Sequence, residues 1–187
     1  MISEFLTRGT TPSISTEQTG VTQQFLRLHL IPDTTALLAV NQISEVLTIP
    51  MTQVVPIPHM PAWVLGVYNW RGDILWIIDL GHLLGLTPLS QHTTNSSTYT
   101  AVVIRDAQQH RATLGQNTSD KVLGLLVNRV EDLELCNPDV IQSPPESAVK
   151  SELVPYLRGY WLKRTGEIFV VLDSNSIIAG MTQNFNF

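Results

Sequence analysis

Two aspartates, Asp79 and Asp173, are the side chains of this sequence that most resemble an acid/base pair. Each follows a short apolar segment and precedes another one that ends in glycine, at Gly85 and Gly180. This setting is typical of a helix N-cap, because the carboxylate accepts hydrogen bonds from the free N–H groups of the first turn, and glycine commonly ends a helix. We therefore predict two helix caps, and no catalytic pair of carboxylates.

Histidine and cysteine offer no better candidates for metal binding or catalysis. The histidines lack the HExxH spacing or any other spacing of a metal site, which predicts surface or edge positions for His29, His59, His82, His92 and His110. The single cysteine, Cys136, ends a predicted strand and suits a small apolar role. The motifs GxGxxG, GxxxxGKS/T and GxSxG do not occur, so nucleotide binding and serine-hydrolase chemistry have no local support.

Arg71 is a candidate of a different kind, for binding a protein. It follows Asn69 and Trp70 and precedes Gly72, which can supply the positive φ of a tight hairpin turn. An arginine in a turn is ordinarily solvated, but tryptophan and arginine are also enriched in the hot spots of protein interfaces. The residues alone leave both interpretations open.

The segment that must position these residues, 64–84, is a unit that occurs twice. It predicts a strand, a turn at Arg71-Gly72, an apolar strand buried on both faces, the Asp79 cap and a short helix. Residues 159–180 repeat this order, with Ile168 in the place of Ile74 and both isoleucines expected in the core. Two copies predict a pseudo-symmetric pair of small β subdomains, each too small to bury a good core alone.

Composition narrows the classes of partner. The 187-residue chain carries a formal charge of −5 and has a sequence pI near 5.4, which argues against nucleic acid or an anionic membrane surface as the main partner. A single cysteine excludes an intramolecular disulfide and suits a reducing cytosol. No apolar stretch is long enough for a membrane span. Short strands divided by Pro, Gly and Asn predict an all-β fold.

Two motifs in the first half of the sequence resemble those of a known protein family. Residues 61–80 follow the pattern PxWVLGVxNxRGxxLxIxDL, and residues 40–47 follow VxxIxEVL. Together they resemble the CheW-like domain of bacterial chemosensory adaptors, over residues 23–180. The resemblance implies two packed, five-stranded SH3-like β-barrels with short helices after the repeat strands. We expect a flexible N-terminal extension in residues 1–21 and a CheW-like domain in residues 22–182, with one barrel in 22–90 and the other in 97–180.

The resemblance also implies a role and a site. Such adaptors are non-enzymatic, cytoplasmic scaffolds without a cofactor or metal, which couple the tips of methyl-accepting chemoreceptors to the regulatory domain of a CheA-type histidine kinase. They serve chemotaxis, phototaxis or pilus-based motility. Trp70 departs from the smaller aliphatic residue common at its position in the family. The predicted partner-binding residues are Ile43, Glu45, Gly66, Asn69, Trp70 and Arg71.

Three alternatives stay open. A small enzyme would place its site in a cleft between the barrels, using Asp79, His82 or Cys136. A nucleic-acid-binding β-barrel is disfavoured by the acidic charge, and a salt-dependent gel shift tests it. A CheW-like module of another kinase pathway would share the fold and differ only in its partners.

Overall fold

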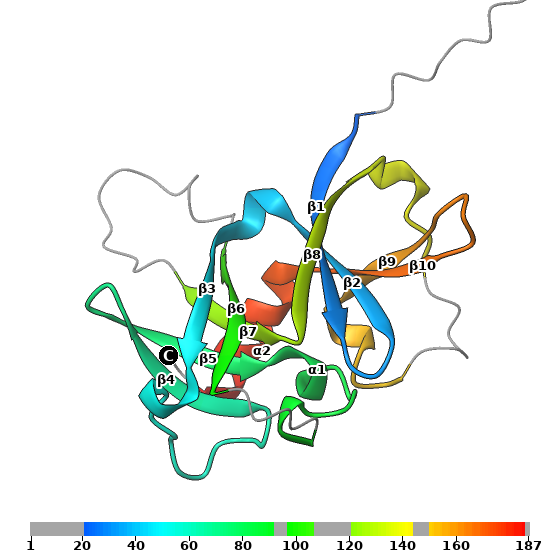
Figure 1. The fold of residues 1–187 in the computed structure, drawn as a ribbon. Helices are drawn as coiled ribbons and strands as arrows, with labels where there is room; N and C mark the ends of the chain where they lie inside the picture. Colours follow the sequence, from blue (N-terminus) through cyan, green and yellow to red (C-terminus); the bar gives the residue numbers. More distant parts are fainter. Residues whose placement is uncertain (1–20, 92–96, 107–120, 144–149, 186–187) are drawn as a thin grey trace, which may run out of the picture.

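Ten strands and two helices follow one another in the part of the chain that the computed structural model describes, which is residues 21–91, 97–106, 121–143 and 150–185 (Figure 1). The first half contains β1 (Gln23–Leu30), β2 (Thr34–Ala39), β3 (Ile43–Pro50), β4 (Val64–Trp70), β5 (Asp73–Asp79) and α1 (Leu80–Leu83). The second half contains β6 (Thr98–Arg105), β7 (Val122–Val127), β8 (Arg129–Cys136), β9 (Leu157–Leu162), β10 (Ile168–Leu172) and α2 (Ser174–Phe185). The all-β prediction is confirmed. The predicted flexible extension lies outside the described residues, apart from Val21.

The strands form two five-stranded sheets with the same internal order. One sheet has the order β8-β1-β2-β10-β9 and the other has β3-β6-β7-β5-β4. The two orders become the same when each strand of the first half is matched with the strand five places later, so that β1 corresponds to β6 and β5 to β10, as the sequence repeat predicts. Neighbouring strands are antiparallel except for two pairs, β2 with β10 and β5 with β7, which are parallel. The sequence repeat is therefore a structural repeat with two-fold pseudo-symmetry.

Each sheet takes strands from both halves of the chain. The hairpin β1–β2 pairs with β8 and β10, whereas β3, β4 and β5 share a sheet with the hairpin β6–β7. The predicted division into barrels at residues 22–90 and 97–180 is therefore wrong. The physical reason is the parallel pairing, which joins strands far apart in the sequence and leaves no local signal. One sheet consists of the consecutive strands β3 to β7, and the other combines β1 and β2 with β8, β9 and β10.

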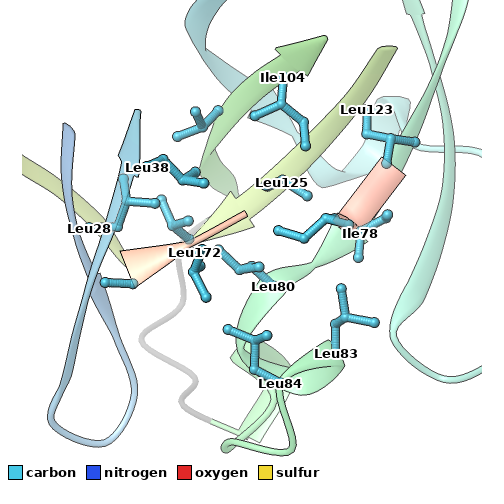
Figure 2. Packing of buried hydrophobic residues seen from close by; sticks show 14 of the residues in the cluster. Leu28, Leu38, Ile78, Leu80, Leu83, Leu84, Ile104, Leu123, Leu125 and Leu172 are labelled. Carbon is cyan, nitrogen blue, oxygen red and sulfur yellow. The ribbon is translucent and has the colours of Figure 1, made fainter. Parts of the chain in front are cut away.

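Apolar side chains fill three spaces, of which the largest lies between the two sheets. Figure 2 shows part of this central cluster, with Leu28 and Leu172 from one sheet facing Ile78, Ile104 and Leu125 from the other. Each of the two smaller clusters is made mainly of side chains from one sheet. A strand between two of these spaces is buried on both faces, which explains why the apolar run of β5 lacks polar alternation.

Most residues of β5 are buried on one face of the strand or the other, but the burial stops before the hairpin turn. Leu75 and Ile77 enter the cluster inside their own sheet, whereas Ile78 enters the central cluster. Ile74, however, is 72% exposed, and its counterpart Ile168 on β10 is 63% exposed. The expected core positions of these two isoleucines are wrong, because each lies next to a hairpin turn where the strand extends past the core. The two hairpins, β4–β5 and β9–β10, lie at opposite sides of the molecule (Figure 1).

Both predicted caps are present. Asp79 is 2% exposed, and its two carboxylate oxygens accept hydrogen bonds from the backbone N–H groups of His82 (3.1 Å) and Leu89 (2.8 Å). Asp173 accepts from the N–H of Asn175 (3.0 Å) and the hydroxyl of Ser176 (2.8 Å).

The predicted glycine stops differ between the two copies. Gly85, with φ of +70°, follows α1 as expected, and its N–H donates to the carbonyl of His82. Gly180 does not end α2, which continues to Phe185. A Cβ at Gly180 would lie 3.1 Å from the ring of Tyr156, so this glycine allows close packing of the helix on that ring and does not stop it.

Candidate functional site

The hairpin between β4 and β5 turns through only two residues, Arg71 and Gly72. Trp70 pairs with Asp73 across the turn, and both turn residues have positive φ, +56° for Arg71 and +94° for Gly72. Two positive φ values are the signature of a type I′ turn, which matches the twist of a hairpin. The side-chain oxygen of Asn69 accepts a hydrogen bond from the N–H of Gly72 at 3.0 Å and so fixes the turn. The positive φ of Gly72 was predicted, and that of Arg71 was not.

Three of the predicted site residues, Glu45, Trp70 and Arg71, contact one another. The indole N–H of Trp70 donates to one carboxylate oxygen of Glu45, and Arg71 Nη2 lies 2.7 Å from the other oxygen. The guanidinium of Arg71 lies over the Trp70 ring, 5.2 Å from its centroid. The Arg71 side chain is 70% exposed and that of Glu45 is 22% exposed. We call this arrangement the Glu45–Trp70–Arg71 cluster.

The cluster also joins the two edges of its sheet. Glu45 lies on β3 and Trp70 ends β4, and these are the first and last strands in the sheet order. The other sheet has a corresponding link between its edge strands, because Lys163, next to the end of β9, lies 3.1 Å from both carboxylate oxygens of Glu134 on β8. In each five-stranded sheet, a carboxylate on one edge strand thus contacts a cation next to the end of the other edge strand.

The Lys163–Glu134 pair of the second sheet belongs to a larger ion-pair network, most of whose side chains are less exposed to solvent than Arg71 is. Arg27 contacts Glu131 (2.6 Å) and Glu134 (3.1 Å) at once. A hydrogen bond from Arg129 to Glu131, aided by the charge of Arg27, lowers the pKa of the Glu131 carboxyl below its ordinary value. The cations of this network are engaged by its own carboxylates. The exposed guanidinium of Arg71 is more accessible to a partner than Arg27 is, because the Arg27 side chain is only 22% exposed.

Of the other predicted residues, Asn69 lies beside the same turn, whereas Ile43 and Gly66 lie elsewhere. Ile43 packs against the central cluster, whereas Trp70 packs against the cluster inside its own sheet. A register shift in β3 between Ile43 and Glu45 separates their environments. Gly66 is buried, with φ of +141°, and a Cβ there would collide with the carbonyl oxygen of Val55. Its geometry thus gives Gly66 a packing role.

Replacing Gly66 with alanine is expected to destabilise the protein by about 2–4 kcal/mol, since the backbone of the Val55 segment must move and the φ value is strained. Urea unfolding measures the effect. Gly72→Ala is the matched control, because Gly72 also has positive φ but has open space around its Cβ position, so only about 1 kcal/mol is expected. Equal losses for the two variants would contradict the packing role of Gly66.

A groove of about 250 Å³ lies along the same hairpin, and no residue pattern predicted it. Ile74 and Val55 line it and are both largely exposed. Strand alternation puts Ile74 and its pairing partner Asn69 on the face of the hairpin opposite to Trp70. The other lining residues are Gln53, Val67, Tyr68, Gly72 and Asp73. The hairpin therefore presents an arginine at its tip and apolar surface beside it.

The three residues of the alternative enzyme site are not all brought together, because Asp79 contacts the backbone N–H of His82 whereas Cys136 lies in the other sheet. Both oxygens of Asp79 are occupied by backbone N–H groups, so this carboxylate serves the fold. Cys136 is buried in the apolar cluster inside the other sheet, and burial raises the pKa of its thiol. Among the described residues, no group of three or more His, Cys, Asp and Glu side chains is placed to hold a metal ion. No helix in the described ranges is long and apolar enough to cross a membrane.

Comparisons with known proteins agree with the fold. The model of the CheW-like domain family matches residues 26–181. The chain is 38% identical over 95 residues to a probable chemotaxis protein CheW of Rhizobium etli, covering 51% of each chain. It is 35% identical over 129 residues to the chemotaxis protein CheW of Rhizobium meliloti, covering 67% of this chain and 70% of that protein.

The match thus spans about half the length of the Rhizobium etli relative. Among solved structures, the scaffolding protein TtCheW from Thermoanaerobacter tengcongensis superposes with a TM-score of 0.60 at 19% identity, covering 82% of this chain and 90% of that one. That likeness concerns the fold alone. Since the family model covers nearly all of the described residues, the chain belongs to the family of proteins with a CheW-like domain.

Proposed function

We propose that this protein is a non-enzymatic, cytoplasmic adaptor that couples methyl-accepting chemoreceptors to a CheA-type histidine kinase. The observation that carries the proposal is the Glu45–Trp70–Arg71 cluster, whose Arg71 is exposed at the tip of a hairpin with an apolar groove on its other face. An exposed arginine and a tryptophan beside accessible apolar side chains have the composition of a protein-binding hot spot. The family and the named relatives support chemotaxis as the setting.

The pseudo-symmetry of the fold supplies a mechanism for coupling. Ile74 and Val55 are exposed at one hairpin, and Leu162 and Ile168 are exposed at the other, on the opposite side of the molecule (Figure 1). One hairpin docks on the CheW-like regulatory domain of the kinase through an apolar centre with a polar rim. The receptor tip binds close to the boundary between the barrels. A small movement of the receptor then changes how the kinase domain is packed.

Arg71→Ala is expected to leave the fold intact and to weaken binding of a partner by about 1–3 kcal/mol, or roughly 5- to 150-fold. The fold survives because the side chain is exposed and alanine keeps a Cβ at the same positive φ. Titration calorimetry with the receptor tip fragment, and separately with the kinase regulatory domain, both from the native host, measures the loss.

Arg129→Ala is the matched control for this measurement. Arg129 is also an exposed arginine, with a 63% exposed side chain paired to Glu131 at 2.6 Å, but it lies in the other sheet. Its replacement is expected to change neither affinity more than about twofold. Unchanged affinity of Arg71→Ala for both partners would remove Arg71 from the binding site.

A further inference from the structure

Trp70 contacts both charged members of the cluster. Its indole N–H donates to Glu45, its ring lies under the Arg71 guanidinium, and the ring also packs against the apolar cluster inside the sheet. An aliphatic side chain at this position would offer neither a donor nor an aromatic face. The arrangement therefore depends on the indole of Trp70.

The consequence of these contacts falls on Arg71. A solvent-exposed arginine ordinarily samples many rotamers, and ordering it on binding costs affinity. Here the Arg71 backbone has a φ of +56° in the two-residue turn, Nη2 lies 2.7 Å from Glu45, and the guanidinium carbon lies over the indole, 5.2 Å from the ring centroid. Arginine has five N–H donors in a planar fork, and only one is engaged by Glu45. Two neighbours thus restrict the rotamers of a side chain that is 70% exposed and so remains accessible to a partner.

We propose that Trp70 is a positioning residue, which holds the Arg71 guanidinium ready to donate to an acceptor group on the protein partner. This inference rests on the proposed function, because Trp70 acts through Arg71. Trp70 raises the affinity by lowering the ordering cost in advance, and its N–H holds the Glu45 carboxylate that pairs with Arg71.

A double-mutant cycle tests the coupling between the two residues. The four proteins are the wild type, Trp70→Leu, Arg71→Ala and the double variant, and the probe is the receptor tip fragment or kinase regulatory domain that responds to Arg71→Ala. We expect Trp70→Leu to weaken binding about 5- to 30-fold when Arg71 is present. In the Arg71→Ala background, the same change is expected to alter affinity less than about twofold.

Two further variants separate positioning from stability. Trp70→Phe keeps an aromatic ring and loses the N–H donor. It replaces Trp70→Leu in the double-mutant cycle if Trp70→Leu melts at a lower temperature than the wild type. Trp161→Leu removes the tryptophan that lies near the cation of the other hairpin, where Lys163 Nζ is 6.0 Å from the ring centroid. It is expected to leave the Arg71-dependent affinity unchanged. Without a partner, the Arg71 Nε–H signal in nuclear magnetic resonance is expected to show greater mobility in Trp70→Phe than in the wild type.

The outcomes distinguish the two proposals. If Arg71→Ala changes neither affinity, the binding site assigned under the proposed function is overturned, and the role of Trp70 with it. If Arg71→Ala weakens binding while Trp70→Leu and Trp70→Phe have the same effect with and without Arg71, only the positioning role is overturned.

Discussion

Replacing Ile77 with aspartate is expected to unfold the protein, whereas the same change at Ile74, on the same strand, is expected to leave it folded. Ile77 is completely buried in the cluster inside its sheet, and Ile74 is 72% exposed. An unpaired carboxylate in an apolar core costs several kcal/mol, and a domain of this size is stable by only about 5–15 kcal/mol. An aspartate at an exposed position carries no such cost.

Circular dichroism during thermal unfolding measures both results. Val171→Asp and Ile168→Asp form a second buried and exposed pair on β10, with 0% and 63% exposure, and are expected to behave in the same way. A cooperative transition for Ile77→Asp near the wild-type temperature would show that β5 is misplaced. Ile74→Asp also tests the groove, since the folded variant is expected to bind the partner that docks on this hairpin more weakly.

Neither half of the chain is expected to fold alone, although each half contains five strands. A fragment of residues 22–96 has β1–β2 without β8 and β10, and it has β3 and β5 without β6 and β7. An isolated hairpin is at best marginally stable in water, and the central cluster would lack one side. The expected result is the absence of a cooperative unfolding transition in either fragment.

Mixing the two fragments is expected to restore the fold, because every missing strand of one half is present in the other. Refolding an equimolar mixture of residues 22–96 and 97–187, followed by size exclusion and urea unfolding, measures the recovery. Cooperative unfolding of the 22–96 fragment as a monomer would contradict the exchange of strands between the sheets.

Local patterns predicted the elements well, since their causes are local. The positive φ at Gly72 follows from a glycine at the end of a hairpin, and the cap at Asp79 follows from a carboxylate ahead of an apolar turn. Strand exchange was missed because parallel pairs such as Ile77 with Gly124 join distant residues. The exposure of Ile74 was missed because an apolar run does not reveal where a hairpin extends past its core.

The candidate site was only partly predictable from the residues themselves. Trp70 and Arg71 were identified as a hairpin pair by their types, whereas Glu45 entered through the family resemblance. The contact between Glu45 and Arg71 depends on how β3 and β4 meet at the edges of their sheet, which no spacing in the sequence encodes. Gly66 was assigned to the site, but its geometry is explained by the close approach of Val55.

The divided sheet has a consequence for how the chain is made on the ribosome. The sheet of residues 43–127 can form as soon as β7 has been translated, but the hairpin β1–β2 cannot pair with β10 until Leu172 has emerged. At about 5–20 residues per second, synthesis from the end of β7 to the end of β10 takes roughly 2–9 seconds. During that time β1 can pair with β8 but β2 lacks its second neighbour, and a nascent chain that stalls before β10 leaves part of the apolar face of the other sheet open to water.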